Sequence, residues 1–341
     1  MDASACHPQA IRDLLTAAWW EARLSAMTVS IRIGCPEDLL GYVPFALGYH
    51  PQDSIVLLAV EGGEIRFTAR ADAAAPTRDL LRQLRRAVRL RSADSHLTLI
   101  AYGGWQVRAA AESLLAELTG KLSFQMDAAM WVEGERFYCL LCDNCSAAGG
   151  KVFDFRASSA AASAVAAGLV ARSSREEAVG QLRPLGGLAA VAMTQAVDRA
   201  EVRLGQTRSI RALVTQGKLA VNQAFAIAKR GDEPSIDEVA WLSVVLADLT
   251  VRDHAWERTD GEDWQFQLWL GLSRRAKPVL AAPITTLLGW CCYRRGDGLL
   301  AGEALRRALC ISPDYSLAGL LLAALQDGQP PSAFSPWPPR K

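Results

Sequence analysis

The chain has almost no surplus of charge of either sign. Its 341 residues include 37 lysines and arginines and 36 aspartates and glutamates, which leaves a formal net charge of +1. A chain with so little net charge has no global field that would draw it to nucleic acid or to an anionic membrane surface. A partner of either kind would have to be bound by a local patch.

Long hydrophobic runs and secretion features are also missing. The longest weakly polar run, residues 157–171, is shorter than the roughly 20 apolar residues that span a bilayer, and the charged first segment has no secretory character. Eight cysteines are too few in a chain of this length for a disulfide scaffold. These absences predict a cytoplasmic protein with no membrane partner. Residues 1–27 have helical spacing and are expected to form an optional N-terminal helix, which makes Met27 an alternative start.

The apolar pattern changes character near the middle of the chain. Strand-like segments alternate with helical ones as far as Gly149 and Gly150, and two of the strand pairs look like hairpins. Strands are expected over 28–33, 54–60, 65–71, 96–102, 126–133 and 136–141, and helices over 36–48, 77–91 and 105–118. This order predicts an α/β domain with a mixed sheet over residues 28–150.

The second half is expected to be an all-α domain over residues 151–329, with helices that include 237–255 and 262–276. A proline-rich tail, 330–341, is expected to be extended because proline lacks the backbone donor. The segment 285–313 resembles a tetratricopeptide repeat, in which small residues let two antiparallel helices approach closely. The positions that carry the resemblance are Leu288, Gly289, Ala301, Leu305, Ala308 and Pro313. One repeat cannot bury its own face, so neighbouring helices must stack on it, and a surface for a protein partner is one possible use.

The turn from Tyr49 to Ser54 is the first candidate site. His50, Asp53 and Ser54 are the residue types of a hydrolytic triad, and Tyr49, His50 and Arg70 are candidates for holding a ligand. A triad depends on spatial roles, which neighbours in sequence rarely fulfil, and no Gly-x-Ser-x-Gly motif occurs. The alternative is a structural turn whose polar side chains bind local backbone.

A metal site is the second candidate. Cys139, Cys142 and Cys145 have the spacing with which one loop presents thiolates to zinc, although inert thiols and no cofactor are the simpler interpretation. The set lacks a fourth ligand, which would have to come from Cys35, His50, His96 or Asp143.

A stripe of arginines is the third candidate. Arg78, Arg82, Arg85 and Arg89 share one face of the expected helix 77–91 and would be able to contact phosphates. No nucleic-acid-binding motif surrounds them, so a solvated face is the favoured interpretation.

Several motifs resemble one bacterial family of uncharacterised proteins. Residues 36–40, 47–51 and 53–56, with the sequences Pro-Glu-Asp-Leu-Leu, Leu-Gly-Tyr-His-Pro and Asp-Ser-Ile-Val, are similar to the domain of unknown function 4192. Tyr102-Gly103, Leu141-Cys142, Val251-Arg252-Asp253 and Pro313-Asp314-Tyr315-Ser316 follow in the family's order. The resemblance spans about residues 30–334 and implies an architecture but no reaction, cofactor or partner.

The preferred functional hypothesis is therefore a cytoplasmic binding or protein-interaction protein, with a ligand or partner surface near residues 49–54. The alternative is a hydrolytic or metal-dependent enzyme that uses His50, Asp53 and Ser54 or Cys142 and Cys145. Nucleic-acid binding through the face from Arg78 to Arg89 is the third hypothesis.

Overall fold

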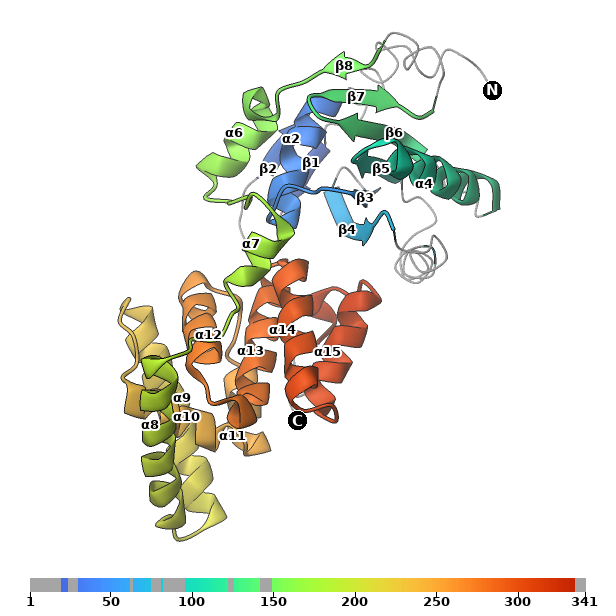
Figure 1. Ribbon diagram of the computed structural model, residues 1–341. Coiled ribbons are helices and arrows are strands. Elements are labelled where there is room, and N and C mark those ends of the chain that lie inside the picture. The colour runs from blue at the N-terminus through green and yellow to red at the C-terminus, as the bar shows by residue number, and fades with distance from the viewer. Residues whose placement is uncertain are drawn as a thin grey trace. The chain divides into compact units, whose positions relative to one another are not determined.

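The chain divides into two compact units, Met1–Ala178 and Val179–Lys341. The computed structural model describes residues 20–23, 30–61, 64–74, 81, 96–121, 126–141 and 149–334. The first unit is built around a mixed sheet and the second consists of helices (Figure 1). The fold class predicted from the change of pattern is confirmed.

A six-stranded sheet forms the centre of the first unit, with the strand order β4-β3-β5-β6-β7-β8. The strands are β3 (Ser54–Glu61), β4 (Glu64–Asp72), β5 (His96–Tyr102), β6 (Met126–Glu133), β7 (Arg136–Cys139) and β8 (Lys151–Val152). Strands β5 and β6 are parallel and the other neighbours are antiparallel. The parallel pair is connected through α4 (Trp105–Ala116), which continues into the π-helical turn η2 (Glu117–Lys121).

Both faces of this sheet are covered, because successive residues of a strand point to opposite sides. Val56 and Leu58 pack with α2 (Pro36–Leu47) and α6 (Ser159–Ala166). Ile55 and Leu57 pack instead in the core that includes α4. The result is a sheet between two helical layers, which explains why the strand segments are so apolar.

The first unit continues past Gly149 and Gly150, where the sequence suggested a boundary, as far as Ala178. Ala160 and Ala164 of α6 are fully buried in the same core as α2, so this helix packs on the sheet. The remaining elements are the 3₁₀ turn η3 (Phe155–Ala157) and α7 (Arg175–Gly180), which begins in the first unit.

At the N-terminus, the prediction of one helix over residues 1–27 is wrong for residues 20–23. These residues form β1 (Trp20–Arg23), which pairs antiparallel with β2 (Ser30–Ile33). Strand pairing satisfies the backbone groups that a last helical turn would otherwise have bonded. Residues 1–19 and 24–29 lie outside the described residues.

The second unit is a series of paired helices. They are α8 (Leu188–Gly205), α9 (Ile210–Lys229), α10 (Ile236–Val245), α11 (Leu249–Trp256), α12 (Asp263–Arg275), α13 (Ala281–Arg294), α14 (Gly298–Ile311) and α15 (Ser316–Gln326), with the 3₁₀ turns η4 (Pro278–Leu280) and η5 (Pro331–Phe334). The single helix expected over 237–255 is divided into α10 and α11. Asp248 caps the new helix, since its carboxylate accepts bonds from the amides of Thr250 and Val251 at 2.9 and 3.2 Å.

Helix α13 lies at the centre of this unit and packs against α12, α14 and α15. Every residue of it from Ala281 to Tyr293 is buried. A Cβ on Gly289 would lie 2.7 Å from Cγ of Leu305, so the missing side chain is what lets α13 and α14 approach. This is the close packing that the segment 285–313 predicts.

The expectation of an extended tail is wrong for its first residues. Pro331–Phe334 form a 3₁₀ turn in which the amide of Ala333 donates to the carbonyl of Pro330 at 3.0 Å. The ring of Phe334 packs edge-on against Trp290 with 6.0 Å between centroids. This aromatic contact ties the turn to α13, and residues 335–341 lie outside the described part.

Candidate functional site

The turn before β3 is held by backbone contacts on both sides. Gly48 ends α2 in the left-handed conformation, with φ of 78°. The amide of His50 donates to the carbonyl of Arg172 at 2.9 Å, and the amide of Arg172 donates to the carbonyl of Gly48 at 2.9 Å. The carbonyl of Asp53 accepts from the amide of Ala73 at 3.0 Å. The turn is therefore fixed to both β4 and the segment before α7.

The three residues of the suggested hydrolytic set have different surroundings. Ser54 is fully buried, and its hydroxyl donates to the carbonyl of Gln52 at 2.8 Å. The half-buried ring of His50 packs edge-on against Phe155, with 4.8 Å between centroids. Burial, and then the charge of Arg156, lower the pKa of His50. Asp53 is exposed. A buried hydroxyl that closes its own turn favours a structural role for Ser54.

Asp53 has an unusual backbone and a close neighbour. Its φ of 43° is the one positive value at a residue other than glycine in the described part of the chain. A Cβ on Gly103 would lie 2.7 Å from Oδ1 of Asp53 and 2.6 Å from Cγ2 of Val107. The end of β5 and the start of β3 therefore meet only because residue 103 is glycine, whose φ is 138°.

Arg70 reaches the turn from β4. It is paired with Val56 across the sheet, and Asp72 is paired with Ser54. Opposite residues share a face, so Arg70 and Asp72 lie on the side covered by α2. Nη2 of Arg70 donates to the carbonyl of Gln52 at 3.4 Å and Nη1 lies 3.3 Å from Oδ2 of Asp72. Nε of Arg70 is buried and has no hydrogen-bonding partner among the described residues.

Two tyrosines accompany Arg70 on this face. Tyr102 is paired with Ser54 from the other side, and its buried hydroxyl has no hydrogen-bonding partner within the described part of the structure. Burial raises its pKa above the usual range. Tyr49 is also buried. We call Tyr49, Ser54, Arg70, Asp72 and Tyr102 the β3 cluster.

The structure thus brings Tyr49, Ser54 and Arg70 to one end of the sheet, together with two residues that sequence reasoning missed. Asp72 and Tyr102 flank Ser54 in the sheet register. The strand order could have revealed them. Strands β4 and β5 lie on either side of β3, so one residue of each must lie opposite Ser54, the first residue of β3. Motif-based reasoning considers residues near in sequence and does not use this pairing.

The structure describes only part of the cysteine motif. Cys139 is half-buried, and its sulfur accepts from the amide of Leu141 at 3.4 Å. Cys35 begins α2, and burial raises the pKa of its thiol to about 11, which makes the metal-binding thiolate scarce. Among the described residues there is no group of three or more potential ligands. Cys142 and Cys145 lie outside these residues, so the zinc site stays a prediction.

The arginine stripe stays a prediction for the same reason. Arg78, Arg82, Arg85 and Arg89 lie outside the described residues, and only Leu81 of the expected helix is described. Leu81 is helical and packs on the core that contains α4.

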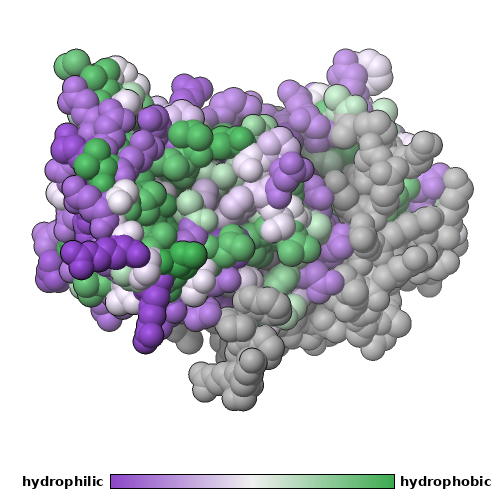
Figure 2. Space-filling view, turned by 90° about the horizontal axis from the view of Figure 1, so that it is seen from below, coloured by the Kyte–Doolittle hydropathy of each residue, from purple (hydrophilic) through white to green (hydrophobic). Residues whose placement is uncertain are grey.

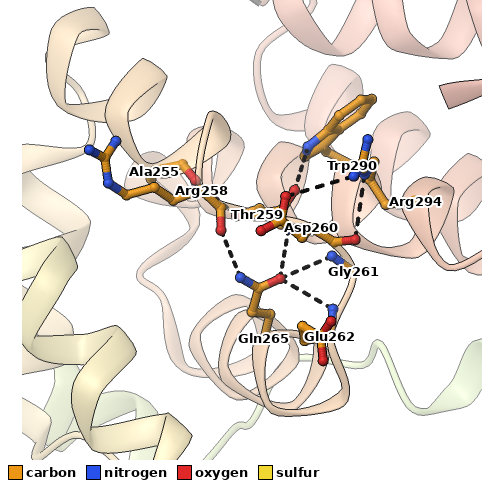
Figure 3. A network of polar contacts seen from close by, with 9 residues as sticks. All are labelled: Ala255, Arg258, Thr259, Asp260, Gly261, Glu262, Gln265, Trp290 and Arg294. Atoms are coloured by element: carbon orange, nitrogen blue, oxygen red, sulfur yellow. Dashed lines mark hydrogen bonds and ion pairs between the residues drawn. The ribbon is translucent and has the colours of Figure 1, made fainter. Parts of the chain in front are cut away.

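The second unit contains a dense polar network in the loop between α11 and α12 (Figure 3). Oε1 of the buried Gln265 accepts from the amides of Asp260, Gly261 and Glu262 at 2.8, 3.0 and 3.2 Å, and its Nε2 donates to the carbonyl of Arg258 at 2.7 Å.

Other side chains bind the backbone of the same loop. Trp290 donates to the carbonyl of Thr259 at 3.1 Å, and Nε of Arg294 donates to the carbonyl of Asp260 at 3.4 Å (Figure 3). Because these side chains bind loop backbone, the network serves to hold the loop.

A second group of contacts joins two of the family motifs, 251–253 and 313–316, which lie far apart in the sequence. Arg252 is bonded through Nε and Nη2 to Oδ1 of Asp253, and its Nη1 lies 3.5 Å from the hydroxyl of Tyr315. These residues link α11 to the start of α15, which is a structural role.

Comparisons with known proteins identify a family. A family model described as "Domain of unknown function (DUF4192)" matches residues 36–332. No curated protein and no solved structure matches the chain.

Proposed function

Since the chain belongs to the family of the domain of unknown function 4192, whose description assigns no activity, we propose from the structure that its first unit binds a small ligand at the β3 cluster. The observation that carries the proposal is the pair of buried polar groups on one face, Nε of Arg70 and the hydroxyl of Tyr102. Neither group has a hydrogen-bonding partner in the described part of the chain. Buried polar groups are nearly always bonded, so two such groups on the two strands that flank β3 favour a ligand.

The place of the cluster supports the same proposal. It lies where β5 and β6 end, and these are the parallel strands of the sheet. Ligands of α/β proteins commonly bind outside the carboxyl ends of parallel strands. An enzymatic use of the turn has less support, because Ser54 is buried and bonded to Gln52.

We place this activity in the cytoplasm. Cys35, Cys291, Cys292 and Cys310 are free thiols, which agrees with a reducing compartment. Within the described residues, no helix combines the length and the apolar character needed to cross a membrane.

Hydrogen–deuterium exchange of the full chain tests the proposal. A library of small metabolites is first screened for compounds that raise the unfolding temperature, since a ligand of the native state stabilises it. Exchange is then compared with and without each compound. We expect slower exchange at residues 49–54, 68–72 and 101–104. A screen without hits, or protection confined to other segments, would contradict the proposal.

The second unit supports a second function, contact with a protein partner. Large hydrophobic side chains are exposed on α8 and α9: Leu188, Val191, Val202, Ile210 and Leu219. Figure 2 shows hydrophobic residues gathered between hydrophilic ones on the face that it presents. Apolar patches of this kind often mark contact surfaces. The test is whether residues 179–334 alone recover the same partner as the full chain.

A further inference from the structure

We propose that the ligand of the β3 cluster carries a carboxylate group, which Arg70 binds through two of its N–H groups with help from the Tyr102 hydroxyl. This inference rests on the proposed function and specifies the chemistry of its ligand. The ligand class is a small organic acid, and the contact is the planar fork of a guanidinium against the two oxygens of a carboxylate.

The hydrogen bonds of Arg70 are the first argument. A guanidinium has five N–H donors and no acceptor. The Arg70 side chain is only 18% exposed, yet it has just two long contacts, at 3.3 Å to Asp72 and 3.4 Å to the carbonyl of Gln52. Its Nε has none among the described residues. The buried Nε still lacks an acceptor among the described residues, and an oxyanion supplies acceptors for Nε and Nη2 together in the geometry of the fork.

The contact with Gln52 is the place where a ligand would enter. Gln52 lies in the turn and is exposed. At 3.4 Å its carbonyl is a weak acceptor, because hydrogen bonds of this kind are normally about 2.9–3.0 Å long. Movement of this carbonyl uncovers the edge of the guanidinium that carries Nε and Nη2. A carboxylate that replaces it forms two charge-assisted bonds with Arg70, at the cost of the 3.4 Å bond from Arg70 and the 2.8 Å bond that the Ser54 hydroxyl donates to the same carbonyl.

The charges around the cluster favour a carboxylate over a phosphate. The groups that act electrostatically on the Tyr49 hydroxyl are Arg70 and Arg175 on the positive side and Asp72 and Glu176 on the negative side. Arg70 already has a carboxylate beside it, because Oδ2 of Asp72 lies 3.3 Å from its Nη1. A ligand at the other edge of the guanidinium lies near this carboxylate, which repels a single negative charge less than the charge of about −2 on a phosphate.

The Tyr102 hydroxyl is the second donor on this face. Tyr102 is paired with Ser54 on one side of β3, and Arg70 is paired with Val56 on the other side. The Tyr102 hydroxyl is buried without a hydrogen-bonding partner among the described residues. Its raised pKa keeps it protonated, so it remains a donor at neutral pH. It would donate to a carboxylate oxygen or to a neighbouring polar group of the acid.

Calorimetric titration of the full chain tests the inference. The probes are a series of monocarboxylic acids, the primary amide of each acid, and inorganic phosphate. We expect the acids to bind and their amides to bind about tenfold more weakly or worse, because a charge-assisted pair is roughly twice as strong as a neutral one. Phosphate should bind more weakly than the best acid.

Four variants separate the possible outcomes. Arg70→Gln and Arg70→Lys should both lose about tenfold or more in affinity for the acid, since lysine keeps the charge but not the fork. Tyr102→Phe should weaken binding less. Arg108→Gln is the matched control, because Arg108 is an arginine of the same unit bonded to a carboxylate, Glu112, at 2.8 Å on α4. It should bind the acid like the unchanged chain. If Arg70→Gln does not fold, Arg70→Lys and Tyr102→Phe still decide the matter.

The inference fails if amides or phosphate bind as well as the acids, or if Arg70→Lys leaves acid binding unchanged. The proposed function would still hold after such a result if some compound slowed hydrogen–deuterium exchange at residues 49–54 and 68–72. The absence of any compound that protects these segments would instead overturn the proposed function itself.

Discussion

At the scale of single residues, His254 shows how burial sets a charge state in the second unit. Its Nε2 lies 3.0 Å from Oδ1 of Asn222, so the neutral ring donates to the amide oxygen. Burial, and then the charges of Arg258 and Lys218, lower the pKa of His254 to about 4. Protonation would add a cation beside two others and is resisted in the folded state.

The stability of the protein should therefore depend on pH through His254. The folded-state pKa lies below the unfolded value of about 6.5, so the unfolded chain takes up the proton first. The contribution of His254 is present above pH 6.5 and is lost as the pH falls towards 4. Urea unfolding measures the free energy of unfolding at pH 7.5 and at pH 5. This free energy should fall less between the two pH values for His254→Gln than for the unchanged chain. Equal losses in both proteins would mean that His254 is not the group that titrates.

At the scale of elements, the contact between α13 and α14 depends on a missing side chain. Alanine in place of a helical glycine normally gains up to about 1 kcal/mol from helix propensity. At Gly289 the added Cβ would lie 2.7 Å from Leu305 and 3.3 Å from the carbonyl of Ala301. Overpacking of this kind costs about 1–3 kcal/mol. Gly289→Ala should therefore lower the free energy of unfolding, by up to about 2 kcal/mol after the propensity gain is subtracted.

Gly319 provides the matched control for this change. It lies inside α15, and a Cβ there would meet nothing within 4 Å. Gly319→Ala should raise the free energy of unfolding by up to about 1 kcal/mol. Chemical denaturation of both variants measures the difference. A stabilising Gly289→Ala would show that the two helices have room to separate.

The bounds and the register of the strands show how much of the β3 cluster the sequence predicts. Strands β5 and β6 have the predicted bounds, because their apolar runs end at clear turn signals. A regular hairpin that pairs Glu61 with Glu64 would place Arg70 opposite Ile55, on the face of α4. The register shifts between Ala59 and Val60, and Arg70 is paired with Val56 instead.

That one-residue shift explains why the composition of the cluster was hard to predict. A change of register by one residue moves every later side chain of a strand to the other face. Sequence reasoning identified Arg70 as a candidate, but no local pattern reveals the bulge in β4, where Arg66 is the extra residue between Ile65 and Phe67. The strand at Trp20–Arg23 was missed for a similar reason, since its helical spacing is overridden by pairing with Ser30–Ile33.

At the scale of the whole molecule, the chain consists of two units that each have their own core. The core of the second unit joins side chains from α8 to α15, with Trp269 and Leu272 fully buried at its centre. The chain enters this unit through a bound segment. Arg307 donates to the carbonyl of Leu182, Arg274 donates to that of Arg183, and the amide of Leu185 donates to the carbonyl of Arg274. A unit with its own core and a fixed first segment is expected to fold alone.

Residues 179–334 produced alone should therefore be helical, unfold cooperatively and recover the protein partner of the full chain. Circular dichroism during heating checks the fold, and affinity capture with quantitative mass spectrometry checks the partner. Leu188→Ser with Val191→Ser should remove the partner, because these side chains are 88% and 55% exposed on α8 and contribute little to the core. Val279→Ser is the control, since Val279 is 72% exposed in η4. A partner that is retained by residues 1–178, or that is lost equally with Val279→Ser, would argue against α8 as the contact surface.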